Sequence, residues 1–395
     1  NNIQTETKIT YAEQYEALGT AHAVKTALPH ISTDNFLVLL GDVPLLSESS
    51  VIKIKEELER HKLVILTAHV KDPTGFGRIS KDKDGKPSAI IEELDCNDEQ
   101  KKIKEINSGI MAFNTEAAKS LIEKIGPNPK KNEYYLTDAI EIAYHEGIGA
   151  TTHSTSEEEV FGVNSKKDLA EAEKINRNKI ASDLMDAGVT IIDPERMDVR
   201  GTLTCGKDVT IDVSTVFIGD VTLSDGVTVG PFTVIANSEI GEATNIHSHS
   251  NIDGASIGSR CNIGPFARIR PETELKEGAK VGNFVETKKT VIGKGSKVNH
   301  LTYVGDAVIG KNTNIGAGTI TCNYDGVNKH KTVIGDEVFI GSGVELVAPI
   351  DVEDGATIGA GSTISKHAPR ERLTIERSKQ KTIDGWKRPS KKEES

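Results

Sequence analysis

Aromatic residues are scarce in this sequence: they make up 4% of its 395 residues, and Trp386 is the only tryptophan. Hydrophobic residues amount to 36%, so the core must be built mainly from aliphatic side chains. Cysteine is also rare, and its positions show no paired spacing of the kind that binds zinc: Cys96, Cys205, Cys261 and Cys322. Four cysteines would permit disulfides, but free thiols in a reducing compartment are the simplest interpretation.

The sequence also lacks long hydrophobic runs and any excess of positive charge. The longest strongly apolar run, residues 36–40, is far too short to cross a bilayer. The polar N-terminus shows no signal-peptide pattern. With 48 basic against 59 acidic residues, the net charge of −11 argues against a nucleic-acid-binding surface. We therefore expect a cytoplasmic protein that binds neither membranes nor nucleic acids.

The C-terminal half instead carries an apolar residue at every sixth position. The series are Ile257, Ile263, Ile269, Leu275, Val281, then Ile292, Val298, Val304, Ile309, Ile315, with one step of five residues from Val304 to Ile309, and finally Ile334, Ile340, Leu346, Val352, Ile358, Ile364. A period of six fits neither a helical stripe nor a long alternating strand. It is typical of a hexapeptide parallel β-helix, in which each short strand points one aliphatic side chain inward. Each coil of such a rod buries its core only against its neighbours.

The N-terminal part, residues 1–164, alternates between strand-like and helix-prone segments. The strand-like segments are 36–40, 62–70, 88–92 and 105–113, and the helix-prone ones are 11–28, 47–61, 115–125 and 136–146. This alternation predicts an α/β domain with a mainly parallel or mixed sheet. We predict that a linker helix over 165–188, a rod over 189–366 and an extended arm over 367–395 follow it.

One polar motif stands at the end of a predicted strand. Asp42, in Gly41-Asp42-Val43-Pro44, follows the apolar run directly. A carboxylate at the C-terminal edge of a buried strand lies where open α/β sheets bind ligands. Taken alone the motif is weak, because Asp after a strand is often only a turn residue.

A series of motifs extends this signal along the chain. In order they are Leu18-Gly19-Thr20-Ala21-His22-Ala23, Gly41-Asp42-Val43-Pro44, Gly75-Phe76-Gly77-Arg78-Ile79, Ile91-Glu92, Glu105-Ile106-Asn107-Ser108-Gly109-Ile110, Glu133-Tyr134-Tyr135-Leu136-Thr137-Asp138 and Gly162-Val163-Asn164. The series closely resembles the uridylyltransferase half of the bacterial bifunctional N-acetylglucosamine-1-phosphate uridylyltransferase/glucosamine-1-phosphate acetyltransferase family. The resemblance continues through the rod. It implies a Rossmann-like α/β nucleotidyltransferase domain followed by a left-handed parallel β-helix.

The resemblance also implies ligands for the N-terminal domain. Asp42 and Asn164 would hold Mg²⁺, which prefers hard oxygen ligands and usually keeps several waters. UDP-N-acetylglucosamine would bind through Gln14, Gly19, Thr20 and Gly41 on the nucleotide side and through Gly77, Glu92, Asn107 and Asn164 on the amino-sugar side.

The sequence departs from the family's pattern at three places. Ala17 stands where the family often has Gln, and Leu40 where an aromatic residue is common. The Gly-rich loop with Arg and Lys that binds the triphosphate does not precede Asn1. We therefore expect an N-terminally truncated domain with impaired uridylyl transfer in this chain, since such electrostatic positioning contributes orders of magnitude in rate.

Polar motifs interrupt the rod in the family's order as well. They are Arg268-Ile269-Arg270-Pro271, Gly282-Asn283-Phe284-Val285-Glu286-Thr287-Lys288, His300-Leu301-Thr302-Tyr303, Asn314-Ile315-Gly316-Ala317, Asn323-Tyr324-Asp325-Gly326 and Gly341-Ser342. Residues 321–331 lack a clear rung and are rich in turn formers, so we predict a loop that leaves the rod and covers the acceptor.

Acetyl transfer to an amine needs a base, donors for the oxyanion and, here, cations for a sugar phosphate. His300 suits the base because histidine titrates nearest neutrality, and Glu286 would orient or assist it. Arg270 and Lys288 would bind the phosphate. By resemblance, Tyr303 and Asn314 also contact the sugar, Asn323 is catalytic, and acetyl-CoA contacts Ala317, Asn323, Tyr324, Ser342, Ala360 and Arg377.

The activity implied by the resemblance has two steps. Acetyl-CoA would acetylate glucosamine-1-phosphate, and UTP would then convert N-acetylglucosamine-1-phosphate into UDP-N-acetylglucosamine, a precursor of peptidoglycan and lipopolysaccharide. The family's rods assemble side by side in threes, so the resemblance also implies a homotrimer.

Three other interpretations remain open at this point. A zinc hydratase of the γ-carbonic anhydrase type also uses a hexapeptide rod and needs three histidines, of which His247 and His249 offer two. A sugar nucleotidyltransferase could carry a rod that is only regulatory or oligomerising. A non-catalytic scaffold is the third, although a scaffold would not need the polar cluster at 270–324.

Overall fold

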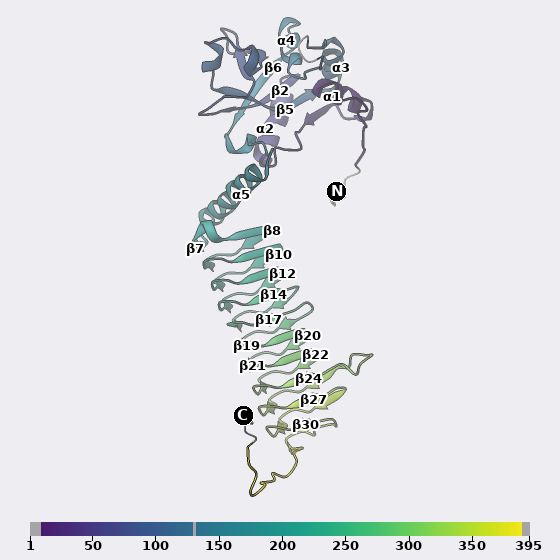
Figure 1. Ribbon diagram of the computed structural model, residues 1–395, viewed down its shortest axis with the longest axis vertical. Helices are drawn as coiled ribbons and strands as arrows, with labels where there is room; N and C mark the ends of the chain where they lie inside the picture. The colour runs from purple at the N-terminus through teal and green to yellow at the C-terminus, as the bar shows by residue number, and fades with distance from the viewer. Residues whose placement is uncertain (1–8, 129–131, 389–395) are drawn as a thin grey trace, which may run out of the picture. The chain divides into compact units, whose positions relative to one another are not determined.

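The computed structural model describes residues 9–128 and 132–388; residues 1–8 and 389–395, the ends of the predicted domain and arm, lie outside the described residues. The chain divides into two compact units (Figure 1), one that ends at Asn176 and one that begins at Arg177. Helix α5 (Lys166–Asp186) crosses this division. Within the described residues, no helix is long and apolar enough to span a membrane.

The first unit is built around a six-stranded sheet. Its strands are β1 (Asn35–Val38), β2 (Leu63–His69), β3 (Arg78–Lys81), β4 (Pro87–Ile91), β5 (Glu105–Asn114) and β6 (Ala150–Thr155). Strand β5 pairs antiparallel with β1, β2 and β3, while β4 adds antiparallel to β3 and β6 adds parallel to β2. The prediction of a mixed α/β sheet is therefore confirmed.

Helices cover both faces of this sheet because successive side chains of a strand point to opposite faces. Leu63 and Ile65 belong to one core cluster, with residues of α1 (Thr20–Ala27), α3 (Thr115–Lys124) and α4 (Asp138–His145). Val64 and Leu66 belong to another cluster, which includes a residue of α2 (Glu48–Leu58). The core is largely aliphatic, as the composition predicts.

The first helix is shorter than predicted. The helix-prone stretch 11–28 becomes an α-helix only at Thr20, because Gly19 has a φ of 100°, which is not helical. Tyr134 fixes this conformation: its N–H donates to the Leu18 carbonyl at 2.8 Å, and its carbonyl accepts from the Ala21 N–H at 2.9 Å. Helix propensity reflects only the local sequence, so it could not show that contacts with the distant Tyr134 delay the start of the helix.

Helix α5 starts with a reciprocal cap. The Asp168 carboxylate accepts from the backbone N–H groups of Ser165 and Asn164 at 2.8 and 3.1 Å, and Ser165 Oγ accepts from the Asp168 N–H at 3.2 Å. Gly188, with a φ of 96°, follows the last turn of the helix.

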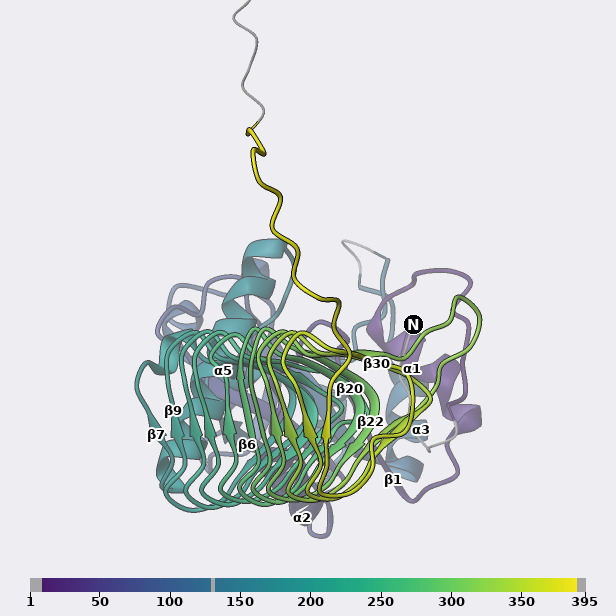
Figure 2. The same ribbon diagram turned by 90° about the horizontal axis from the view of Figure 1, so that it is seen from below.

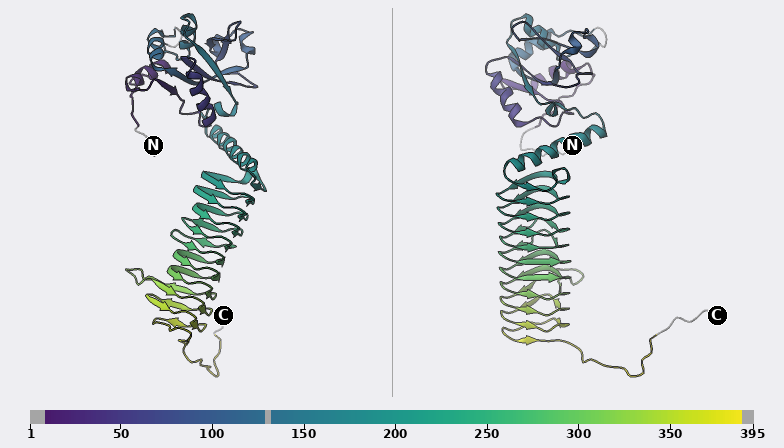
Figure 3. Two further views of the ribbon diagram at one scale, coloured as in Figure 1. Left: turned by 180° about the vertical axis from the view of Figure 1, so that it is seen from behind. Right: turned by 90° about the vertical axis from the view of Figure 1, so that its left-hand side faces the viewer.

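The second unit is a rod of stacked coils whose strands form two long parallel sheets of 14 and 11 strands (Figure 3). The first sheet contains β8 (Asp198–Cys205), β10 (Val216–Leu223), β12 (Val234–Ile240), β14 (Asn251–Asp253), β15 (Ser256–Ile257), β17 (Arg268–Ile269), β18 (Glu274–Leu275), β20 (Glu286–Ile292), β22 (Tyr303–Ile309), β24 (Ile320–Cys322), β25 (Thr332–Ile334), β27 (Glu345–Val347), β28 (Ile350–Val352) and β30 (Thr363–Ile364). The second contains β7 (Thr190–Ile191), β9 (Thr210–Ile211), β11 (Thr228–Val229), β13 (Asn245–Ile246), β16 (Asn262–Ile263), β19 (Lys280–Asn283), β21 (Lys297–His300), β23 (Asn314–Ile315), β26 (Phe339–Ile340), β29 (Thr357–Ile358) and β31 (Leu373–Thr374).

The hexapeptide series forms the core of this rod, as predicted. Every residue of the three series is buried. Ile263, Val281 and Val298 pair in successive coils, so one inward position is repeated through the stack. Seen along the stack, successive coils follow the same outline (Figure 2). The prediction of a hexapeptide β-helix is confirmed.

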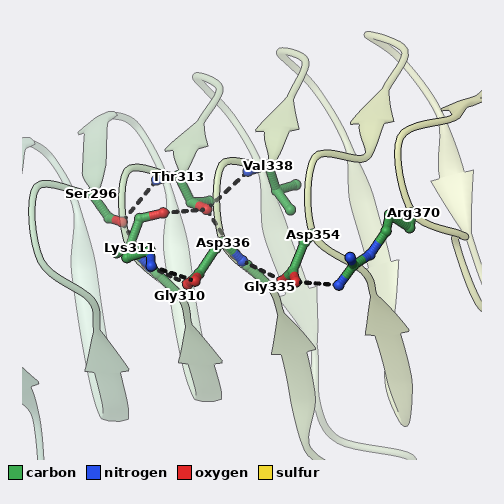
Figure 4. A network of polar contacts seen from close by, with 9 residues as sticks. All are labelled: Ser296, Gly310, Lys311, Thr313, Gly335, Asp336, Val338, Asp354 and Arg370. Carbon is green, nitrogen blue, oxygen red and sulfur yellow. Dashed lines mark hydrogen bonds and ion pairs between the residues drawn. The ribbon is translucent and has the colours of Figure 1, made fainter.

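Side chains also join the coils near the C-terminal end of the rod (Figure 4). One ladder uses hydroxyl groups: Ser296 Oγ accepts from the Thr313 N–H at 2.9 Å, and Thr313 Oγ1 accepts from the Val338 N–H at 3.1 Å. The other uses carboxylates: Asp336 accepts from the Lys311 N–H and Asp354 from the Asp336 N–H, both at 2.8 Å. Each ladder satisfies backbone donors at turns between strands.

The coils extend beyond the predicted end of the rod. Ala368 bridges to Val352, and β31 pairs with β29, where an extended arm from 367 onward was expected. Arg370 secures this last turn, since its guanidinium donates to the Asp354 carboxylate at 2.7 Å. The hexapeptide spacing stops at Ile364, so the periodic pattern contains no sign of this irregular final coil.

Residues 323–331, here called the 323–331 loop, leave the stack between β24 and β25 (Figures 1 and 3). An isolated antiparallel bridge joins Tyr324 to Lys329, so the loop doubles back on itself. The prediction that 321–331 departs from the rod is confirmed for 323–331, whereas Thr321 and Cys322 belong to β24 and stay in the stack.

Candidate active sites

The first unit contains a cavity of about 670 Å³ beside the ends of its strands. Three of the residues predicted to bind UDP-N-acetylglucosamine line it: Thr20, Glu92 and Asn107. The remaining lining residues include Leu40, Gly75, Leu94, Gly109, Met111, Asn128, Tyr135 and Thr137, for which sequence analysis gave no role. Tyr135 and Thr137 lie within a motif of the series, which is the only signal that could have indicated them.

Gly19 and Thr20 are positioned by the segment around Tyr134. A Cβ on Gly19 would lie 2.5 Å from the Tyr134 carbonyl oxygen, so only glycine fits there. Thr20 Oγ1 accepts from the Leu136 N–H at 2.9 Å. Gln14 adds a further tie, because its Nε2 donates to the Gly19 carbonyl at 3.2 Å. The structure thus brings these three predicted nucleotide-side residues together.

The predicted amino-sugar residues also converge. The Asn107 N–H donates to the Gly77 carbonyl at 2.8 Å, and a Cβ on Gly77 would lie 3.5 Å from Glu92 Oε1. The neighbouring Arg78 is buried and pairs with Glu93 at 2.6 Å. Hydrogen bonding to Arg78 lowers the pKa of Glu93, and this carboxylate also accepts from the Gly75 N–H. The pair therefore fixes the glycine-containing turn against the cavity.

The two predicted magnesium ligands come from segments that the structure joins. The Val163 N–H donates to the Asp42 carbonyl at 2.8 Å, which places Asn164 beside the turn that carries Asp42, after β1 has ended at Val38. A Cβ on Gly41 would have nothing within 4 Å, so a ligand can approach the backbone there. Within the described residues there is no group of three or more His, Cys, Asp or Glu that could hold a metal. One carboxylate and one amide suit Mg²⁺, which draws further ligands from water and phosphate.

Leu40, where the family often has an aromatic residue, lines the cavity. Its Cδ1 atom would lie 2.5 Å from a Cβ added to Gly109, whose φ is 79°. Leu40 therefore packs directly on the Gly109 backbone, and the cavity wall at this point is apolar.

In the rod, His300 ends strand β21 and pairs in register with Asn283 of the preceding coil. Its Nδ1 lies 2.7 Å from Asn283 Oδ1. Because an amide oxygen only accepts hydrogen bonds, Nδ1 carries the proton and Nε2 is left as the basic nitrogen. A groove of about 380 Å³ beside His300 is lined by His247, Asn262, Gly264, Pro265, Lys280, Gly282, Asn283 and Asn299.

Glu286 has a different partner. Arg270 donates to its carboxylate at 2.7 Å, and Arg268 lies 3.9 Å from it. In this structure Asn283 orients His300, and Glu286 instead orients Arg270. Sequence analysis missed Asn283 because its contact with His300 spans 17 positions and depends on the register between coils.

Two lysine side chains lie together: Lys288, in the coil that follows the one with Arg270, and Lys329, from the 323–331 loop. The Lys329 side chain lies against Lys288, and hydrogen bonding between the two amines lowers the pKa of Lys288, with the charge of Arg270 acting in the same direction. Asp306 opposes this shift. The Asp306 carboxylate also accepts from Asn323 Nδ2 at 2.5 Å. This arrangement of positive charge suits an anion.

Four of the six residues predicted to bind acetyl-CoA, namely Ala317, Ser342, Ala360 and Arg377, lie along one column of successive coils, whereas Asn323 and Tyr324 lie at the start of the 323–331 loop. The Gly343 N–H donates to the Ala317 carbonyl at 2.8 Å, and the Gly361 N–H donates to the Ser342 carbonyl at 2.9 Å. Ala360 and Arg377 continue the column, since a Cβ added to Gly341 would lie 2.5 Å from Ala360 N and one on Gly361 would lie 3.7 Å from Arg377 Cδ. Two predicted residues lie elsewhere: Asn314 begins β23 in register with Lys297, and Tyr303 begins β22 in register with Glu286.

The histidine pair suggested for zinc has other contacts. His247 Nε2 lies 3.2 Å from Asn262 Oδ1. The His249 ring is stacked between Phe232 and Phe266, with ring centroids 5.0 and 4.8 Å apart. Among the residues that the structure describes, no third His, Cys, Asp or Glu joins the pair to form a group that could hold a metal, whereas a zinc site of this type needs three histidines.

Comparisons with known proteins give the same division of the chain. A family model described as "Nucleotidyl transferase" matches residues 1–159, and one described as "Bacterial transferase hexapeptide (six repeats)" matches residues 331–366. The chain is 47% identical to the "Bifunctional protein GlmU" of Herminiimonas arsenicoxydans and 48% identical to those of Janthinobacterium sp. (strain Marseille) and Ralstonia pickettii (strain 12J). Each alignment covers 97% of this chain and 85% of the relative.

Proposed function

Because the chain belongs to the family of bifunctional GlmU proteins, we propose that it is a bifunctional transferase that acetylates glucosamine-1-phosphate and transfers uridylyl groups to N-acetylglucosamine-1-phosphate. The product of the first reaction is the acceptor of the second. The single observation that carries the acetyltransferase half is the pairing of His300 with Asn283 beside a groove of the rod.

In acetyl transfer, His300 Nε2 removes a proton from the substrate ammonium or from the amine as it attacks the acetyl carbonyl of acetyl-CoA. A carbon–nitrogen bond forms, the thioester bond breaks, and the thiolate of coenzyme A leaves with a proton. A base whose pKa lies near the working pH commonly contributes about 10²–10⁴-fold to such a step. Arg270 and Lys288 bind the sugar phosphate, and the backbone column at Ala317, Ser342 and Ala360 accommodates the coenzyme.

In uridylyl transfer, Glu92, Asn107 and the Gly77 backbone hold the amino sugar, and Thr20 and the Gly19 backbone hold the nucleotide. A phosphate oxygen of the sugar phosphate attacks the α-phosphorus of UTP, and pyrophosphate leaves. Asp42 and Asn164 would hold Mg²⁺, which neutralises phosphate charge when bound. The protein's own contribution is to position the two substrates for this displacement.

We further propose that the enzyme is a homotrimer of the cytoplasm. Bulky apolar residues are exposed along one corner of the rod, namely Phe232, Phe266, Phe284 and Leu301, which supports side-by-side association. All four cysteines are free thiols, which supports a reducing compartment. Light scattering that gives the mass of one chain for a fully active sample would contradict the trimer.

The decisive experiment mixes the chain with acetyl-CoA and glucosamine-1-phosphate and measures free thiol. Stoichiometric thiol release, with N-acetylglucosamine-1-phosphate as the product, would support the proposal. A second mixture contains the chain, UTP and N-acetylglucosamine-1-phosphate. If the chain releases pyrophosphate there but no thiol in the first mixture, the alternative holds: a nucleotidyltransferase whose rod is only regulatory or oligomerising.

A further inference from the structure

The 323–331 loop keeps its shape without a hydrophobic core of its own. Tyr324 is 61% exposed and Val327 is 83% exposed. The hydrogen bonds of the loop converge instead on Asp325. Its Oδ1 accepts from the backbone N–H groups of Val327 and Asn328 at 2.8 and 2.6 Å, and its Oδ2 lies 2.6 Å from His330 Nε2.

These contacts keep the Asp325 carboxyl group ionised. The hydrogen bond from His330, followed by those from Asn328 and Val327, holds the pKa of Asp325 well below its usual range. The backbone then closes the turn, because the Asp325 N–H donates to the Asn328 carbonyl and the His330 N–H donates to the Asn323 carbonyl. One carboxylate therefore organises both ends of the loop.

The loop meets the rod at the cation group described above. At its start, Asn323 Nδ2 donates to Asp306 at 2.5 Å. Near its end, Lys329 pairs with Tyr324 across the doubled-back loop, and its side chain lies close to Lys288 and to the Asp306 carboxylate. Because the contact with Lys288 is a hydrogen bond, one of the two amines accepts in it, and an arriving anion favours the charged form of both. A folded loop thus places a third basic side chain beside Arg270 and Lys288 before the substrate arrives.

We propose that Asp325 is a positioning residue for acetyl transfer: its carboxylate folds the 323–331 loop so that Lys329 completes, with Arg270 and Lys288, the site for the sugar phosphate. The inference rests on the proposed acetyltransferase function and adds the residue that builds the site. Asp325 acts through Lys329 and does not itself touch the substrate.

The test compares Asp325→Ala with the wild-type chain. We expect the KM for glucosamine-1-phosphate to rise about tenfold or more, as when a charge-assisted hydrogen bond is lost. The KM for free glucosamine, which has no phosphate, should stay unchanged. Asp325→Asn keeps an oxygen for the two backbone donors but loses the charge and the oxygen that faces His330 Nε2, so its KM should rise less than that of Asp325→Ala. The midpoint of thermal unfolding should hardly change, because the loop lies outside the ladder of coils.

A matched control removes a similar carboxylate elsewhere in the rod. Asp225 accepts from the Lys207 N–H at 2.8 Å and so joins two coils far from the loop in sequence. Asp225→Ala should lower the unfolding midpoint and leave the KM for glucosamine-1-phosphate unchanged. Limited trypsin digestion gives a readout independent of activity: cleavage after Lys329 should accelerate in Asp325→Ala and not in Asp225→Ala.

A double-mutant cycle decides whether Asp325 acts through Lys329. Asp325→Ala combined with Lys329→Ala should raise the KM for glucosamine-1-phosphate no more than Lys329→Ala alone. The inference would be overturned if the KM increase of the double variant were the product of the increases of the two single variants. It would also be overturned if the KM of Asp325→Ala stayed within about twofold of wild type. Neither result would contradict the proposed acetyltransferase activity. A wild-type chain that releases no thiol would overturn the proposed function and this inference together.

Discussion

The two units of this chain position their polar residues by different means. In the rod, neighbours are set by register, so His300 meets Asn283 because they occupy equivalent places in adjacent coils. In the α/β unit, neighbours come from segments far apart in sequence, as when Thr20 accepts from the Leu136 N–H. A rod site depends on a few adjacent coils, whereas the α/β site depends on the fold of its whole unit.

The largest expected effect tests whether the rod's chemistry depends on a single side chain. His300→Ala should lower kcat for acetyl transfer by about 10²–10⁴-fold, the usual contribution of a general base. Uridylyl transfer, which uses the other unit, should be unaffected. Thiol release and pyrophosphate release from one preparation measure both. An unchanged kcat when chemistry is rate-limiting would assign the proton transfer to another group, such as Glu286.

A core substitution tests whether the units unfold separately. Ile340 is fully buried in the ladder, so Ile340→Ala should destabilise the rod by about 2–5 kcal/mol. Because each coil contacts only its neighbours, we expect calorimetry to show a lowered transition for the rod and an unchanged one for the α/β unit. A single transition that moves as a whole would show that the two units unfold together.

Arg270→Ala tests the phosphate site with a smaller expected effect. Loss of a charged hydrogen bond costs about 1.5–3 kcal/mol, so the KM for glucosamine-1-phosphate should rise roughly tenfold or more. The KM for acetyl-CoA should change little. If wild-type enzyme used free glucosamine as well as its 1-phosphate, Arg270 would have another role.

The smallest effect concerns pH and the carboxylate ladder. The hydrogen bond from the Lys311 N–H lowers the pKa of Asp336 in the folded chain. Ionised Asp336 therefore stabilises the folded chain at any pH above the pKa of this group in the unfolded chain, about 3.9. This contribution to the free energy of unfolding is lost as the pH falls through the lower pKa of Asp336 in the folded chain. Asp336→Asn should lower the unfolding midpoint at pH 7, and the difference from wild type should shrink in acid. A difference that stays constant from pH 7 to pH 2 would exclude this ionisation as the cause.

The sequence predicts the rod better than it predicts the α/β unit because the rod repeats. A six-residue period shows which side chains point inward, and every one of them is buried. The start of α1 at Thr20 could not be found this way, since Gly19 depends on Tyr134, which is distant in sequence. The last coil lacks the repeat and was expected to be an arm.

The candidate sites show the same limit. Motifs indicated His300, Glu286 and Arg270, and the structure shows which of them pair. Which of these residues contact each other depends on the register between adjacent coils, and a short sequence motif does not contain that information. The role of Asp325 also escaped detection, because an acidic residue in a turn-rich segment is usually only a turn former.

One feature of the rod has a consequence for protein engineering. Val298 pairs with Ile315, 17 positions later, whereas Ile315 pairs with Ile340, 25 positions later. The extra length is the outward excursion at 323–331, and the stack continues in register beyond it. Loops of other lengths and sequences could therefore be grafted at this point, so that acceptor preference is varied on a scaffold that stays the same.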